Sequence, residues 1–142
     1  MADAVFQQMV KEAGLEDDIQ IDSAGTSGWH AGETAHRGTL QVLKKHQIPY
    51  NGRARQFRSE DMHDFDYVLA MDDSNLYDME TIARGQSNTE TRLFLSYAHE
   101  RGLVDVEEVP DPYYSSKFDY TYDLVTAGSE ALLDYIRAKH NL

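Results

Sequence analysis

The chain contains no cysteine among its 142 residues. No disulfide, thiolate metal site or cysteine nucleophile can therefore be built from it. Basic residues are also few. The chain has 13 lysines and arginines and 25 aspartates and glutamates, which gives a formal net charge of −12. Since so acidic a chain repels phosphate backbones, we exclude a general nucleic-acid binder.

Long apolar runs are lacking as well. No stretch approaches the ~20 apolar residues that span a bilayer, and the opening residues MADA carry no basic region that leads into an apolar one. The sequence thus predicts no membrane span and no signal peptide, and we expect a soluble, cytoplasmic protein. Hydrophobic residues make up 41% of the chain, which is enough for a folded globule. With no repeat, low-complexity tract or linker, residues 1–142 are predicted to form a single domain.

Apolar residues recur at helical spacing in three segments. Residues 2–13 predict a helix that ends at Gly14, a residue suited to the position after a helix. Residues 33–46 predict a second helix. The strongest pattern is that of residues 118–136, although Gly128 inside it costs about 1 kcal/mol relative to alanine.

Three short segments predict strands. Residues 19–21 alternate between apolar and polar side chains and lead into the glycine-containing loop 23–28. Residues 67–71 form a continuous apolar run, which is typical of a parallel strand covered on both faces. Residues 93–95 suggest another short buried strand. Because strands and helices alternate, the sequence predicts an α/β fold with a parallel sheet, for which three strands are few.

Asp111 is the first candidate for chemistry. It lies between Pro110 and Pro112, which restrict its backbone, and the rings of Tyr113 and Tyr114 follow, where they could stack on an aromatic substrate. The alternative is a turn in which Asp111 caps the next helix, the usual meaning of Asp-Pro. Taken by itself, this pattern favours the turn.

A second candidate region is the loop 23–28 with Trp29, the only tryptophan. Its glycines could bring backbone N–H groups near an anion, but neither common glycine-rich nucleotide pattern is present, so a plain connection is favoured. Trp29 either packs half-buried in the core or forms the wall of a pocket for a ring. Six of the 13 basic residues fall within residues 37–58, and they either attract an anionic ligand or balance charge on a solvated surface.

Two other chemistries do not fit the positions of the residues. Asp64 and Asp66 resemble the paired aspartates of carboxylate-nucleophile phosphatases, but there the acids follow a buried strand, and here they precede it. The six histidines show no spacing typical of a zinc enzyme.

Four segments together resemble the low-molecular-weight protein tyrosine phosphatases in order and spacing. They are SAGTSGWH (23–30), ARQ (54–56), VLAMDDSNL (68–76) and VPDPYY (109–114). The similarity runs from residue 1 to about residue 140. It implies the three-layer sandwich of the phosphotyrosine phosphatase I type, in which a four-stranded parallel sheet has helices on both faces.

The resemblance also implies an activity. In this family a C-x5-R-[ST] loop follows the first strand and binds the phosphate, its thiolate attacks phosphorus, and the aspartate of a D-P-[YF] loop protonates the leaving phenol and then activates water. Carried over to this sequence, Asp111 resembles that general acid, while Trp29, Tyr113 and Tyr114 resemble walls of the cleft for the phosphotyrosine ring. The implied substrate is a phosphotyrosine protein or a small aryl phosphate. No metal and no organic cofactor are implied.

The chain departs from the family at its beginning. Residues 1–6 match the family's first helix, so the first, central strand and the C-x5-R-[ST] loop, about fifteen residues, have no counterpart. We therefore expect an N-terminally truncated domain with unpaired strand edges. Without the nucleophile and the oxyanion donors, the printed chain is expected to be inactive.

Two hypotheses remain open at this stage. Either the chain is part of an active tyrosine phosphatase whose cysteine is encoded upstream, or it is a catalytically dead phosphatase-like module that binds or regulates partners. If the truncation is deliberate or natural, a homodimer or strand exchange could hold the remainder together.

Overall fold

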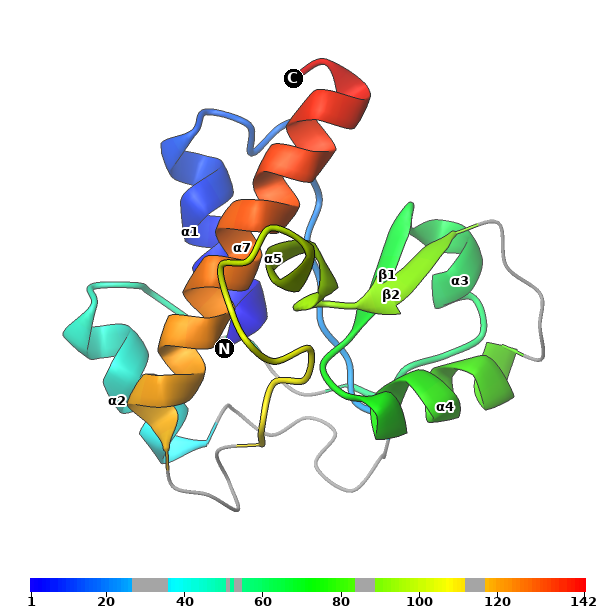
Figure 1. The fold of residues 1–142 in the computed structure, drawn as a ribbon, viewed down its shortest axis with the longest axis horizontal. Helices are drawn as coiled ribbons and strands as arrows, with labels where there is room; N and C mark the ends of the chain where they lie inside the picture. The colour runs from blue at the N-terminus through cyan, green and yellow to red at the C-terminus, as the bar shows by residue number, and fades with distance from the viewer. Residues whose placement is uncertain (27–35, 51, 53–54, 84–88, 112–116) are drawn as a thin grey trace.

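The computed structural model describes residues 1–142 except 27–35, 51, 53–54, 84–88 and 112–116. Figure 1 shows helices arranged around a small parallel sheet. In chain order the elements are α1 (Ala2–Glu12), α2 (Arg37–Lys45), α3 (Asp61–Asp64), β1 (Tyr67–Ala70), α4 (Asp73–Ala83), β2 (Glu90–Leu93), α5 (Ser96–Glu100) and α7 (Phe118–His140). Within the described part of the chain, no helix has both the length and the apolar character to cross a membrane.

Helix α1 packs against the long helix α7, as Figure 1 shows. Val5, Phe6 and Val10 are buried because their spacing places them on one face of the helix. The helix predicted over residues 2–13 is confirmed, and Gly14 after its end adopts a φ of 73°, which glycine tolerates without strain. The second helix, predicted over residues 33–46, is confirmed over Arg37–Lys45, and residues 33–35 of that prediction lie outside the described residues.

Gly128 lies where α7 meets the turn after β2. A Cβ atom at this position would come within 2.6 Å of Phe94 Cε1 and 2.9 Å of Leu95 Cδ2. The predicted helix over 118–136 is confirmed and extends to His140. Close packing, rather than backbone preference, explains the glycine inside it.

Strands β1 and β2 pair in parallel, with Tyr67 opposite Glu90 and Ala70 opposite Leu93. The predicted strand at 67–71 is confirmed over its first four residues, but it is not covered as expected. Only Ala70 is buried, at 1% exposure, whereas the other three residues of β1 are half-buried. The reason is that, among the described residues, no strand pairs with the second edge of β1.

The other two strand predictions need correction. The strand predicted over residues 93–95 is observed as β2, which begins at Glu90 and ends at Leu93. Residues 19–21 form no strand, because within the described chain no main-chain hydrogen bond joins residues 20–24 to another segment. Pairing begins only at an isolated parallel bridge between Gly25 and Gln56.

Two clusters of buried apolar side chains lie on opposite faces of the sheet. The larger one is contributed mainly by α1, α5 and α7, and the smaller one by α3, α4 and neighbouring residues. Leu69 packs against the larger cluster and Val68 against the smaller one, as the alternation of side chains along a strand requires. Helices therefore cover both faces of the two-stranded sheet.

Candidate functional site

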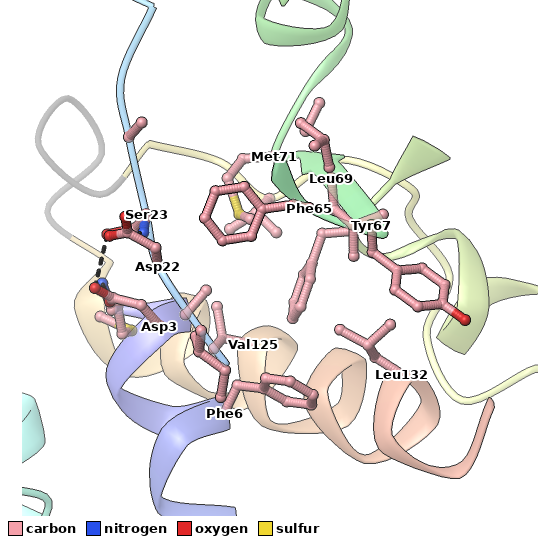
Figure 2. A pocket seen from close by; sticks show the side chains of 18 of the residues that line it. Asp3, Phe6, Asp22, Ser23, Phe65, Tyr67, Leu69, Met71, Val125 and Leu132 are labelled. Carbon is pink, nitrogen blue, oxygen red and sulfur yellow. Dashed lines mark hydrogen bonds and ion pairs between the residues drawn. The ribbon is translucent and has the colours of Figure 1, made fainter. Parts of the chain in front are cut away.

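A groove of about 1130 Å³ lies between residues 19–26 and β1. Figure 2 shows Phe6 from α1 and Val125 and Leu132 from α7 on one side of the open space, with Phe65 and Met71 on the other. These apolar side chains would be covered if the sheet continued beyond β1. The groove is thus the space beside the unpaired strand edge.

Asp3 joins three segments at the end of the groove where α1 begins. Its Oδ2 atom accepts hydrogen bonds from the Ser23 hydroxyl at 2.7 Å and the Tyr50 hydroxyl at 2.8 Å. Its Oδ1 atom accepts one from the N–H of Ala4 at 2.9 Å and lies 3.5 Å from the ammonium of Met1. Ser23 is thereby held beside the first turn of α1.

These contacts change the acidity of both partners. Burial by itself would raise the pKa of Asp3, but the N-terminal ammonium and the hydrogen bonds from Ser23, Tyr50 and Ala4 outweigh it and hold that pKa below its usual value. Burial and the hydrogen bond to the Asp3 carboxylate raise the pKa of Tyr50 to about 12. Asp3 is therefore ionised and Tyr50 neutral at pH 7.

Arg55 connects the groove wall to α3. Its Nε donates to Asp22 at 3.1 Å, and its two Nη atoms donate to the carboxylate oxygens of Asp61 at 3.0 and 3.2 Å. The buried Asp61 also accepts the backbone N–H of Arg58 at 2.9 Å. Burial would raise the pKa of Asp61, but these hydrogen bonds and the two arginine charges lower it. The Arg55 guanidinium thus serves two carboxylates, which argues against an anion site centred on it.

Asp111 lines the groove near the carboxyl end of β1. The N–H of Val109 donates to the carbonyl of Met71 at 2.8 Å, which fixes the approach to Asp111 beside that end. Asp72 lines the groove there as well, and its carboxylate accepts the N–H of Asn75 at 2.7 Å in the first turn of α4. The structure therefore places the predicted acid at the groove. Of the other predicted site residues, Trp29, Tyr113 and Tyr114 lie outside the described residues.

This arrangement offers a carboxyl group that can donate or accept a proton, but the chain has no thiol to attack phosphorus. Within the described residues, no group of three or more histidine, aspartate or glutamate side chains is placed to hold a metal ion.

The sequence pattern does not indicate the network around Asp3 or the ion pair of Arg55 with Asp61. An acidic residue in the first turn of a helix is a recognisable signal for helix stabilisation. It does not identify Tyr50, 47 positions away, as a partner. Such contacts depend on how the chain folds back on itself, which local spacing does not encode.

A family model described as "Low molecular weight phosphotyrosine protein phosphatase" matches residues 1–142. The chain is 37% identical over 143 aligned positions to the low molecular weight protein-tyrosine-phosphatase YfkJ of Bacillus subtilis, an alignment that covers 100% of this chain and 90% of that protein. It is 38% identical to the low molecular weight protein-tyrosine-phosphatase PtpA of Staphylococcus aureus, of which 88% is covered.

Solved structures give the same result. The crystal structure of YfkJ from Bacillus subtilis superposes with a TM-score of 0.92 at 36% identity, covering 98% of this chain and 86% of that one. A protein tyrosine phosphatase from Entamoeba histolytica, crystallised with Hepes in the active site, superposes with a TM-score of 0.87 at 27% identity, covering 99% and 88%. The described fold is thus shared with proteins that carry this activity in their names.

Proposed function

The chain belongs to the low molecular weight phosphotyrosine protein phosphatase family, and on this premise we propose that its fold serves the hydrolysis of phosphotyrosine monoesters, in proteins or small aryl phosphates. The supporting observation is the similarity over the whole chain, at 37% identity, to a named tyrosine phosphatase. We further propose that the 142-residue chain has no turnover by itself, since it contains no cysteine.

The fold inferred for this function is a three-layer α/β sandwich that lacks one strand beside β1. Helices α1, α5 and α7 on one face and α3 and α4 on the other support the three layers. The unpaired edge of β1 and the groove next to it support the missing strand. Residues 1–142 are proposed to form one domain, because α7 contacts α1, α2 and α5.

Asp111 is the proposed general acid. It would give its proton to the phenolate oxygen that leaves phosphorus and then take one from the attacking water. Such a group contributes about 10²–10⁴ to a rate, and only when a nucleophile attacks phosphorus. Trp29, Tyr113 and Tyr114 are proposed to hold the phosphotyrosine ring by stacking. This chemistry requires no metal and no organic cofactor.

A chimera tests the proposed activity. The first strand and C-x5-R-[ST] loop of an active family member would be joined ahead of residue 1, with a Cys→Ser version of the loop as the matched control. The chimera is expected to release phosphate from a phosphotyrosine peptide, the control is not, and Asp111→Asn in the chimera should lower kcat about 10²–10⁴-fold. A folded chimera with no activity, or one unaffected by Asp111→Asn, would refute the proposal.

The second candidate function is a module that binds phosphotyrosine proteins without turnover. The full-length similarity combined with the absence of cysteine favours it. Calorimetry of the unmodified 142-residue chain with a phosphotyrosine peptide tests it, with the unphosphorylated peptide as control. Heat specific to the phosphorylated peptide supports binding, and none at millimolar concentration rejects it.

A further inference from the structure

We propose that Glu108 positions Asp111, because its carboxylate attaches the segment that leads to Asp111 to the first turn of α4. The inference rests on the proposed function, in which Asp111 is the general acid. Glu108 is assigned no contact with the substrate, so it is a positioning residue rather than a catalytic one.

The Glu108 side chain reaches the beginning of α4 from 35 positions along the chain. Its Oε1 atom accepts a hydrogen bond from the backbone N–H of Asp73, the first residue of that helix, at 2.8 Å. The first N–H groups of a helix have no acceptor within the helix itself. Asp72 supplies an acceptor to Asn75 locally, whereas the acceptor for Asp73 comes from the segment before Asp111. The helix dipole also favours a carboxylate at this end.

A second contact lies one residue further along the same segment. The backbone N–H of Val109 donates to the carbonyl of Met71, the residue that follows β1, at 2.8 Å, and Val109 is buried in the larger cluster. Two consecutive residues are therefore attached to two elements, Glu108 to α4 and Val109 to the end of β1. Without the Glu108 contact the segment could pivot about the hydrogen bond of Val109.

The chain has little backbone freedom between these contacts and Asp111. Pro110 is the single residue between Val109 and Asp111, and a proline ring holds φ at about −65°. Val109 and Asp111 each precede a proline, a position that disfavours helical backbone angles. A displacement of Glu108 is thus passed on to the Asp111 carboxyl group. A general acid must lie within hydrogen-bond reach of the leaving oxygen, and a misplacement of about 1 Å can cost about 10²-fold in rate.

The neighbouring Glu107 makes a different contact and provides the matched control. Its Oε1 atom lies 3.4 Å from His99 Nδ1 on α5, and both side chains are exposed. Glu107→Ala therefore removes the same charge from the same stretch of chain but leaves the hydrogen bond between Glu108 and Asp73 in place.

The leaving group of the substrate distinguishes positioning from a general loss of structure. The test uses the chimera that carries the first strand and C-x5-R-[ST] loop of an active family member. Phenyl phosphate, like phosphotyrosine, releases a phenol with a pKa of about 10 and needs a proton at the leaving oxygen, whereas dinitrophenyl phosphate releases a stable phenolate without one. Glu108→Ala should lower kcat/KM at least about tenfold for phenyl phosphate and less than about twofold for dinitrophenyl phosphate. Loss of folding would lower both by the same factor.

Further variants connect this effect to the hydrogen bond itself. Glu108→Gln keeps an oxygen acceptor and should stay within about threefold of the parent chimera on both esters. Asp73→Pro removes the N–H donor at a helix position that accepts proline, and it should reproduce the pattern of Glu108→Ala. Adding Glu108→Ala to Asp73→Pro should cause no further loss, since both remove one interaction. Asp73→Ala keeps the N–H and should resemble the parent chimera.

Amide hydrogen exchange tests the same contact in the 142-residue chain, where no catalysis is needed. In Glu108→Ala the amides of Asp73 and Val109 should exchange at least about threefold faster than in the unmodified chain. Glu107→Ala and Glu108→Gln should leave both exchange rates unchanged.

Any of four results would overturn the proposal. They are an equal loss on both esters in Glu108→Ala, no loss on either ester, the same selective loss in Glu107→Ala, and unchanged exchange of the Asp73 and Val109 amides in Glu108→Ala. An inactive chimera would instead refute the proposed function, and the exchange experiment would then decide by itself whether Glu108 holds the segment before Asp111.

Discussion

At the scale of single residues, the buried carboxylate of Asp61 connects the loop arginine Arg55 to α3. It is 3% exposed and accepts hydrogen bonds from the Arg55 side chain and the Arg58 backbone. Asp61→Ala removes the acceptor that these donors share, and we expect a loss of about 1–3 kcal/mol in the free energy of unfolding by urea. Asp22→Ala removes the more exposed partner of Arg55 and should cost less than about 1 kcal/mol. An equal or larger loss for Asp22→Ala would show that the assignment is wrong.

The same contacts predict how stability depends on pH. The folded-state pKa values of Asp3 and Asp61 are lowered, so both carboxylates contribute stability that is complete above their unfolded pKa of about 4. This contribution is lost as the pH falls through the folded pKa. We expect the urea midpoint to decline below about pH 4 and to decline less steeply in Asp3→Asn and Asp61→Asn. An unchanged decline in both variants would contradict the pKa directions.

Asp111 could be predicted as a site residue only from the resemblance of residues 109–114 to the family's D-P-[YF] loop, since its flanking prolines taken alone favour a turn. The structure places this residue at the groove. The partners of Asp3 and Asp61 could not be predicted, since their contacts join the first helix to Tyr50 and a loop arginine to α3.

At the scale of elements, substitution of Gly128 in α7 distinguishes the effect of side-chain packing on stability from the effect of helix propensity. Alanine is favoured over glycine by about 1 kcal/mol in a helix interior. A Cβ atom here, however, would lie 2.6 Å from the Phe94 ring, so Gly128→Ala should destabilise the protein by about 1–3 kcal/mol. Ala138→Gly at the exposed end of α7 should show the propensity effect alone, a loss of about 1 kcal/mol. Thermal and urea unfolding measure both, and a stabilised Gly128→Ala would contradict the packing.

Helices and strands differ in how far sequence predicts them. The helices at 2–12 and 118–140 could be predicted because their hydrogen bonds are internal and their apolar period is intact. Residues 19–21 carry a strand pattern but form none, because a strand also needs a neighbouring backbone. The apolar run at 93–95 predicts a strand that the structure has instead at Glu90–Leu93 (β2), because so short an apolar segment does not define where a strand begins and ends.

At the scale of the whole molecule, the chain has the fold of a phosphatase family but contains no cysteine, the residue whose thiolate begins the family's reaction. The sequence could predict both features, the first from four segments in order and the second from composition. What it could not predict is the shape of the result, a groove of about 1130 Å³ with half-buried strand residues along one wall. That shape arises because helices α1 and α7 pack against each other although no strand pairs with the second edge of β1 among the described residues.

This chain shares the fold of the phosphatase family yet contains no cysteine, and we propose that it forms no covalent intermediate with phosphorus. Intact-mass spectrometry after incubation with excess aryl phosphate and an acid quench tests this proposal, because a covalent intermediate adds about 80 Da per phosphoryl group. We expect only the unmodified mass of 16.2 kDa, with no phosphate released above buffer. An adduct of about 80 Da that accumulates with time and is hydrolysed on dilution would contradict it, since some residue other than cysteine would then attack phosphorus.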